Sequence, residues 1–168
     1  MRDLAGHASR ALITVASYLD GARTGQEPEL RDAIAYFRAA SAGHADPASV
    51  AERGRQAGAA LGDDPHARVA ELAGNVLALV EATPDDALVT SPMGTMTLLG
   101  YLPTRTFELA VHTADLARAL GVPLDVPGTA AAQALQVVAD LAVSAGLAGP
   151  LLLAATGRPG LPAGFSVL

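Results

Sequence analysis

Hydrophobic residues recur at helical spacing through the first half of the chain. In residues 2–20 the apolar positions fall three or four residues apart, which predicts one amphipathic helix. These positions are Leu4, Ala8, Leu12, Val15 and Leu19.

Proline, glycine and acidic residues indicate where further helices begin and end. A second helix is predicted to begin at Glu27-Pro28. The pairs Asp46-Pro47 and Asp64-Pro65 each combine an N-cap residue with a proline at the first helical position, so each predicts another helix start. The first half is therefore predicted to hold four helices, over residues 2–20, 27–41, 47–62 and 65–83.

The second half begins with a stretch of different character. Residues 84–97, "PDDALVTSPMGTMT", have no helical period and predict a loop with a short extended piece. A long helix follows to residue 119 or 120, and the pattern leaves open whether Pro103 kinks or restarts it. Gly121 ends this helix. Two further helices are predicted over residues 129–145 and 148–156.

These elements place the chain in the all-α class, as a single domain over residues 1–168 in which antiparallel helices with short connections form a bundle. Hydrophobic residues make up 51% of the sequence but aromatic residues only 4%, and there is no Trp. The core must therefore be built largely from Ala, Leu and Val, which favours closely packed helices.

Charge and cysteine content exclude several functions. The 11 basic residues are all Arg, 17 residues are acidic, and no basic stripe is visible, so nucleic acid is not expected as a partner. The absence of Cys excludes disulfides, thiolate metal ligands and a cysteine nucleophile. The apolar run 141–157 is interrupted by glycine and proline, and no signal-like segment opens the chain. We expect a cytoplasmic protein without a membrane span.

One polar stripe runs along the long, otherwise apolar helix. Arg105, Glu108, His112 and Asp115 follow one another at steps of three, four and three residues. Residues at these separations lie on one helix face. Charged groups on such a helix must find partners inside the bundle, because burying them unpaired is costly.

A Glu and a His four residues apart can share a metal ion if a third ligand comes from elsewhere. His44 and His66 lie beside Asp-Pro loop signals and are expected in solvent, whereas His7 lies next to the apolar face of the first helix. Spacing alone leaves simpler alternatives open, namely an ordinary Glu–His ion pair and a satisfied core histidine. The sequence also lacks the Glu-x-x-His and His-Glu-x-x-His patterns of other metal sites.

Two segments of the sequence change this balance. "MRDLAGH" and "RTFELAVHTADLARALG" resemble motifs of the mycothiol-dependent maleylpyruvate isomerase family, within the DinB-like metalloenzyme superfamily, and the resemblance extends to the terminal "TGRPGLPAGFSVL". It implies a DinB-like four-helix bundle that binds a divalent metal, usually zinc. The ligands that it implies are His7, Glu108 and His112.

The resemblance also implies a chemistry. Mycothiol would be the cosubstrate, and its thiolate would add to a small electrophile in a transferase or isomerase reaction. Arg105 could anchor a substrate carboxylate, although a buried pair with Asp3 remains an equal alternative. Asp3 and Asp115 are candidates for orienting the imidazoles.

The sequence departs from the family pattern at both ends. Relatives carry a further helix before the first motif, so we expect a bundle incomplete at the N-terminus, an exposed apolar strip on the first helix and a homo-oligomer. We also expect no counterpart of the separate C-terminal domain of the isomerase. The alternative function is therefore a non-catalytic bundle that binds metal or another protein.

Overall fold

The structure is a computed structural model that describes residues 1–19, 25–43, 47–158 and 160–168. The predicted all-α class is confirmed, with one small β-hairpin added. The elements are α1 (Arg2–Leu19), α2 (Ala33–Ala42), α3 (Pro47–Ala60), α4 (Pro65–Ala82), β1 (Leu88–Ser91), β2 (Gly94–Thr97), α5 (Leu98–Leu120), α6 (Gly128–Ser144) and α7 (Ala148–Ala155).

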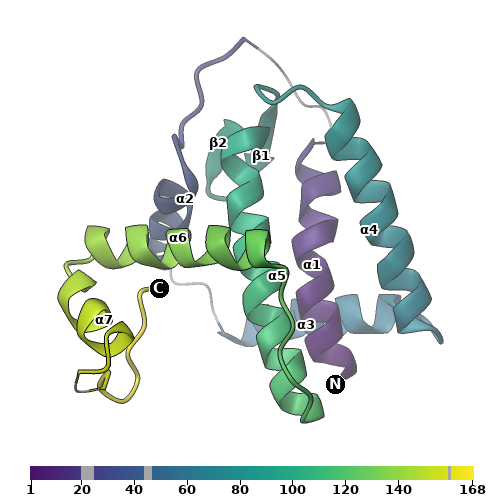
Figure 1. Ribbon diagram of the computed structural model, residues 1–168. Helices are drawn as coiled ribbons and strands as arrows, with labels where there is room; N and C mark the ends of the chain where they lie inside the picture. Colours follow the sequence, from purple (N-terminus) through teal and green to yellow (C-terminus); the bar gives the residue numbers. More distant parts are fainter. Residues whose placement is uncertain (20–24, 44–46, 159) are drawn as a thin grey trace.

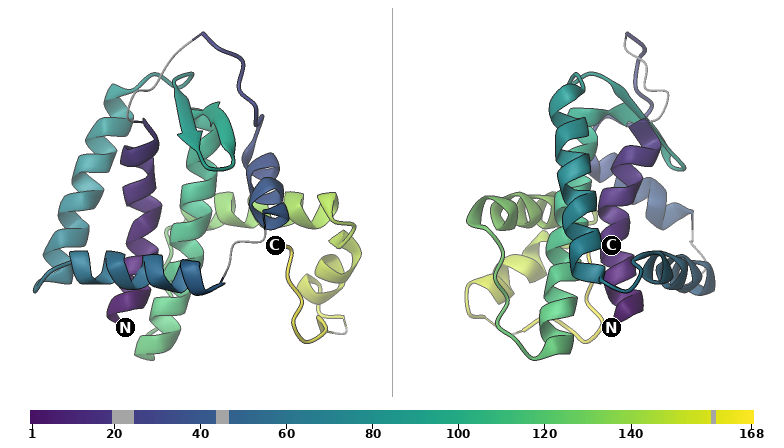
Figure 2. Two further views of the ribbon diagram at one scale, coloured as in Figure 1. Left: turned by 180° about the vertical axis from the view of Figure 1, so that it is seen from behind. Right: turned by 90° about the vertical axis from the view of Figure 1, so that its right-hand side faces the viewer.

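Three long helices form the centre of the molecule. α1 lies between α4 and α5, and α5 runs in the opposite direction to the other two (Figure 1). α3 crosses the N-terminal half of α1, and α6 crosses α5 on the opposite side of the molecule (Figure 2). The N-terminal end of α1 and the C-terminal end of α5 therefore lie side by side, and this arrangement positions the candidate site.

The ends of α4 and α5 follow the predicted signals. The Asp64 side chain caps α4 by accepting a hydrogen bond from Ala67 N at 3.0 Å. Thr97 caps α5 in the same way, and Gly121 ends it in the left-handed conformation at φ 68°. The helix continues through Pro103, so the open question of a restart there is answered. The predicted N-cap Asp46 and the predicted loop residue His44 lie outside the described residues.

The prediction for the second helix was wrong at its start. α2 begins at Ala33, where the Asp32 side chain accepts a hydrogen bond from Ala35 N at 2.8 Å. The preceding residues instead pair with the hairpin, because Leu30 N donates to Thr95 O at 2.9 Å and Thr95 N donates to the Glu29 carboxylate at 2.8 Å. The predicted extended piece in residues 84–97 is an antiparallel hairpin with Leu88 opposite Thr97.

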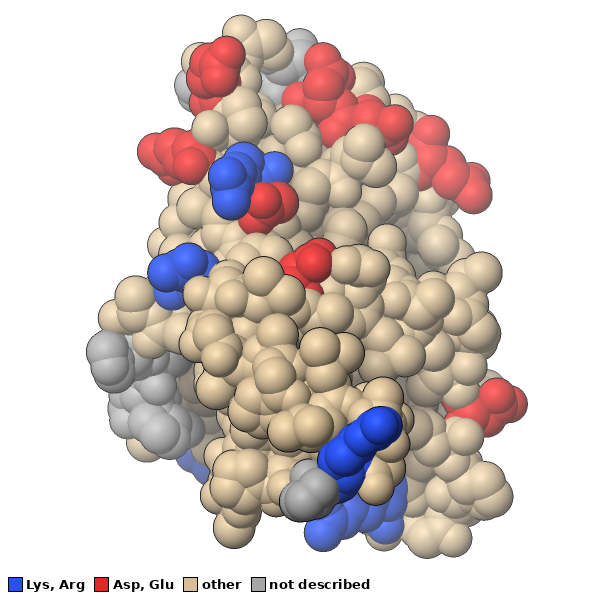
Figure 3. All heavy atoms as spheres, turned by 60° about the vertical axis from the view of Figure 1, so that its left-hand side comes forward, with Lys and Arg blue, Asp and Glu red and all other residues tan. Residues whose placement is uncertain are grey.

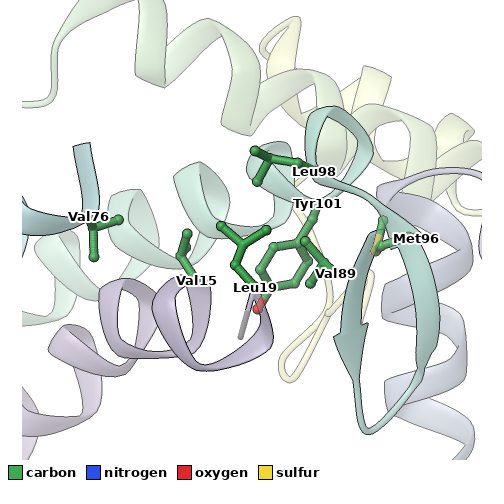
Figure 4. Packing of buried hydrophobic residues seen from close by; sticks show 7 residues of the cluster. All are labelled: Val15, Leu19, Val76, Val89, Met96, Leu98 and Tyr101. Carbon is green, nitrogen blue, oxygen red and sulfur yellow. The ribbon is translucent and has the colours of Figure 1, made fainter. Parts of the chain in front are cut away.

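Two hydrophobic clusters form the core. The first joins α1, α4 and α5 to the hairpin (Figure 4) and contains Val15, Leu19, Val76, Val89, Met96, Leu98 and Tyr101. The second joins α2, α5 and α6 and contains Ala33, Phe37, Phe107, Ala134, Val137 and Leu141. Since α5 contributes to both clusters, it is the element that connects them.

The expected exposed strip on α1 was wrong for its C-terminal half. Val15 and Leu19 are only 2% and 6% exposed, because α4, α5 and the hairpin cover them. Leu4, Ala8 and Leu12 are half-buried. The described helices therefore already cover most of the face that the sequence predicted to be open.

Glycines allow α1 and α3 to cross at very close range. A Cβ atom on Gly6 would collide with the Gly58 backbone and lie 2.6 Å from Gly54 O. A Cβ atom on Gly58 would lie 2.8 Å from Arg2 O. This close crossing holds the backbone of α3 directly against the segment of α1 that carries His7.

The surface adds two observations. Figure 3 shows a face on which most acidic side chains lie in the upper part, basic side chains lie both beside them and at the lower end, and a broad area in the lower half is largely uncharged. Large hydrophobic side chains are exposed on α6 and α7, including Leu135, Val143 and Leu152. Among the described residues, no helix combines the length and apolarity needed to cross a membrane.

Candidate metal centre

The structure brings together the three residues proposed as ligands, although about a hundred positions separate His7 from the other two. The His7 ring on α1 meets the His112 ring on α5 edge to face, with ring centroids 4.5 Å apart and planes at 79°. One helical turn before His112, the Glu108 carboxylate lies 3.1 Å from its Nε2 atom. The two imidazoles and the carboxylate therefore form one contiguous group.

The two aspartates proposed to orient the imidazoles differ. Asp115 Oδ2 lies 3.3 Å from Nδ1 of His112, so the ring of His112 has a carboxylate at each nitrogen. The Asp3 side chain is exposed and forms no hydrogen bond with either imidazole among the described residues. The geometry for orienting a ring is thus present for Asp115 and absent for Asp3.

The protonation of the group follows from these contacts. The hydrogen bond to Glu108, reinforced by Asp115, raises the pKa of His112 above its ordinary value. Burial, together with the charge of His112, lowers the pKa of His7. Burial acts to raise the pKa of Glu108, but its hydrogen bond with His112 and the charge of Arg105 outweigh burial and leave that pKa lowered. Near neutral pH the group favours an ionised Glu108 beside a neutral His7.

The donor set fits a divalent metal in its chemistry. Two imidazoles and one carboxylate are a ligand set of catalytic zinc, and donors about 2.0–2.1 Å from a tetrahedral zinc lie about 3.3 Å from one another. The 3.1 Å between His112 Nε2 and Glu108 Oε2 is close to that spacing. Within the described part of the chain, however, no three such side chains already converge as a metal site. Metal binding would require the Glu108–His112 hydrogen bond to give way to two metal–ligand bonds.

Arg105 is a buried cation one turn from Glu108. It is only 8% exposed, and its Nε and Nη1 atoms donate to Thr104 Oγ1 at 2.9 Å and Thr14 Oγ1 at 3.3 Å. Its guanidinium lies 5.3 Å from the centre of the Tyr36 ring and 4.7 Å from that of Tyr101.

No carboxylate among the described residues forms an ion pair with Arg105. The pair with Asp3, left open by the sequence, is not formed. Arg105 is therefore held by hydroxyl groups and aromatic faces, and its charge also acts on Glu108 one turn away, without an ion pair between the two. No contact of the guanidinium with the described residues prevents it from attracting an anion into the cavity.

A cavity of about 480 Å³ connects Arg105 to the histidine group. The described residues that line this cavity include His7, Glu108, Arg105, Tyr36, Arg10 and Arg53. Three of these residues were missed by the sequence analysis. Arg10 follows His7 by one helical turn, so its spacing could have revealed it, whereas Tyr36 and Arg53 reach the cavity only through the tertiary packing of α2 and α3.

Fold and site together define a DinB-like helical bundle with a His–Glu–His group, of which His7 and Glu108 line a cavity that contains three arginines. The chain belongs to the family of the mycothiol maleylpyruvate isomerase N-terminal domain, whose model matches residues 1–117. This match includes His7, Glu108 and His112 and ends near the end of α5, so that α6 and α7 lie beyond it. No curated protein and no solved structure matches the chain.

Proposed function

We propose that His7, Glu108 and His112 hold a divalent metal, most readily Zn²⁺, and that the chain acts with mycothiol as a transferase or isomerase on a small anionic electrophile. The observation that carries this proposal is the meeting of two imidazoles and a carboxylate, from two distant segments, beside an arginine-lined cavity whose wall includes His7 and Glu108. Membership of the mycothiol maleylpyruvate isomerase family supports the choice of thiol.

A metal at this position would supply Lewis acidity, which lowers the pKa of a bound thiol and favours the nucleophilic thiolate. The thiol must come from a cosubstrate, because the chain has no Cys. Three protein ligands leave coordination positions open, as catalytic rather than structural zinc sites do.

The neighbouring residues favour an ionised Glu108 and can orient the His112 ring for metal binding. Glu108 is ionised because its pKa is lowered, so it can serve as a carboxylate ligand. Nε2 of His112 is hydrogen-bonded to Glu108 in the metal-free protein, so metal binding would displace the proton on Nε2. Asp115, 3.3 Å from Nδ1, would then accept the Nδ1 proton and hold the tautomer in which the Nε2 lone pair binds the metal. A carboxylate–histidine–metal arrangement of this kind fixes both the tautomer and the ring orientation.

Arg105 binds the anionic part of the electrophile. Its charge is buried without a carboxylate partner among the described residues, and the threonine and tyrosine contacts hold its guanidinium in place. Residues three apart on a helix have Cβ atoms about 5–6 Å apart. An electrophile held by Arg105 would therefore place a nearby carbon within reach of a sulfur bound beside Glu108.

The reaction requires one bond to the thiol sulfur. In a transferase, the sulfur–carbon bond forms as the carbon–carbon π bond breaks. The neighbouring carbon takes up one proton, which balances the one that the thiol released, and the sulfur–carbon bond is retained in the product. In an isomerase, addition to a carbon–carbon double bond allows rotation about the resulting single bond, and expulsion of the thiolate restores the double bond. The isomerase reaction consumes no proton overall, because the thiolate that adds is the thiolate that leaves.

The test is the rate of thiol consumption or of substrate isomerisation with mycothiol, Zn²⁺ and a panel of unsaturated carboxylates. His112→Ala removes one ligand and is expected to reduce turnover by more than the roughly 10–100-fold lost when only an outer partner of a metal ligand is removed. The matched control is His66→Ala, because His66 is exposed on α4. Equal rates in wild type and His112→Ala would overturn the proposal and favour a non-catalytic bundle.

A further inference from the structure

His7 also lines a second cavity, on the side of the ring that faces α3. This open groove has a volume of about 610 Å³, and its described lining consists of Asp3, Leu4, His7, Val50, Ala51, Gly54 and Arg55. The groove therefore runs between α1 and α3 and ends at the same imidazole as the arginine-lined cavity.

Gly54 gives the groove its access to the ring. A Cβ atom on this residue would lie 3.6 Å from His7 Nδ1 and 3.5 Å from His7 Cβ, so the absence of a side chain leaves one face of His7 uncovered by α3. The close crossing at Gly6 and Gly58 holds the backbone of α3 near α1 and thereby sets its distance to His7. A ligand lying along α3 can thus reach the ring from outside the first cavity.

The two cavities differ in charge. The first contains three arginines, Arg10, Arg53 and Arg105, and one carboxylate, Glu108, among its described lining residues. The groove contains one carboxylate, from Asp3, and one guanidinium, from Arg55, beside apolar side chains. An anion is attracted to the first cavity, whereas the groove suits an uncharged molecule with amide and hydroxyl groups that hydrogen-bond to both charges.

We propose that the two cavities bind the two substrates separately: the uncharged thiol cosubstrate lies in the groove between α1 and α3, and the anionic electrophile lies in the arginine-lined cavity. The two substrates then enter from different sides of the His7 ring, and the thiol sulfur reaches past the edge of the ring to lie beside Glu108, where it meets the electrophile. This inference rests on the proposed function, because it assumes that a thiol is the cosubstrate.

The experiment is calorimetric titration of the zinc-loaded full chain with two unreactive ligands. The S-methyl derivative of mycothiol, which is uncharged and cannot form a thiolate, reports on the groove. Succinate, a dianion without an electrophilic carbon, reports on the arginine-lined cavity. In wild type we expect each ligand to bind in the presence of a saturating amount of the other.

Three variants separate the two sites. Ala51→Leu narrows the groove and is expected to weaken binding of S-methyl mycothiol by about tenfold or more, the effect of a few misplaced methyl groups in a pocket, with succinate affinity unchanged. Arg53→Gln removes a cation from the arginine-lined cavity and is expected to weaken the binding of succinate alone. Ala59→Leu is the control for the first substitution, because Ala59 is exposed on the same helix and is not among the described residues that line either cavity. This control substitution should change the affinity for neither ligand.

Three results would overturn the inference. Mutual exclusion of the two ligands would place both in one cavity. If Ala51→Leu binds S-methyl mycothiol with unchanged affinity, the groove is not the binding site of the thiol, while the proposed function stays intact. Failure of the zinc-loaded wild type to bind the thiol derivative at all would overturn the proposed function and this inference together.

Discussion

His7 and His112 touch one another but have opposite electrostatic surroundings. His112 lies between the carboxylates of Glu108 and Asp115, which favour its charged form. His7 has the charges of Arg10 and Arg53 nearby, in addition to His112, and is partly desolvated. A proton entering this group therefore goes to His112 first.

This order can be measured by NMR titration of the two imidazoles in metal-free protein. We predict that His112 titrates above about pH 6.5, the ordinary value for histidine, and that His7 titrates below it. Since the folded-state pKa of His112 is raised, the stability it contributes is complete below about pH 6.5 and is lost as the pH rises through the folded-state value. Glu108→Gln removes the main cause and should bring the pKa of His112 down. The reverse order of titration would show that the ring contacts are not those described.

The site residues differ in how far the sequence could predict them. The helical spacing of Glu108, His112 and Asp115 indicates their common face directly, and the structure places all three in contact. The approach of His7 was implied by resemblance, since no local pattern specifies which face of α1 meets α5. Arg53 belongs to α3, whose position depends on a crossing of helices that spacing within one helix cannot predict.

At the scale of elements, local signals predicted most helices but not the segments held by distant contacts. Asp64 identified the start of α4 because its cap is made within four residues. Glu29 and Leu30 look like the start of a helix, yet they bond to Thr95, 66 and 65 positions away. Such pairing depends on the hairpin being in place, so it outweighs the local preference.

The crossing of α1 and α3 gives the second prediction. Gly6→Ala places a Cβ atom against the backbone of α3, where no side chain can move aside, and we expect it to lower the free energy of unfolding by about 3 kcal/mol or more. Gly74→Ala is the matched control: Gly74 lies inside α4 with nothing within 4 Å of an added Cβ atom, so the substitution should stabilise by up to about 1 kcal/mol. Urea denaturation measures both. Similar stabilities for the two variants would contradict the close crossing.

At the scale of the whole molecule, α5 contributes buried residues to both hydrophobic clusters and so joins them. Leu98 and Tyr101 belong to the cluster with α1 and α4, and Phe107 belongs to the cluster with α6. Tyr36 packs against both. We therefore propose that residues 1–168 unfold as one domain, although the family match ends at residue 117.

Leu141 on α6 tests this cooperativity, because it is only 3% exposed and lies beyond the family match. Leu141→Ala should lower the stability by about 2–5 kcal/mol. It should shift circular dichroism and tyrosine fluorescence together, since the tyrosines lie on α1, α2 and α5. Leu135→Ala, at a position 66% exposed on the same helix, should change the stability by no more than about 0.5 kcal/mol. A fluorescence transition unmoved by Leu141→Ala would show that α6 unfolds as a separate unit.

The binding of a metal by His7, Glu108 and His112 is the central claim, and elemental analysis of protein purified without a metal-affinity tag tests it most directly. After incubation with zinc and dialysis, wild type and His66→Ala are predicted to retain about one zinc per chain. His7→Ala and His112→Ala are predicted to lose it, and Glu108→Gln to retain it more weakly, because the amide keeps the shape of the ligand but not its charge. A wild type without zinc after this treatment, or a His112→Ala variant that retains as much as wild type, would contradict the account.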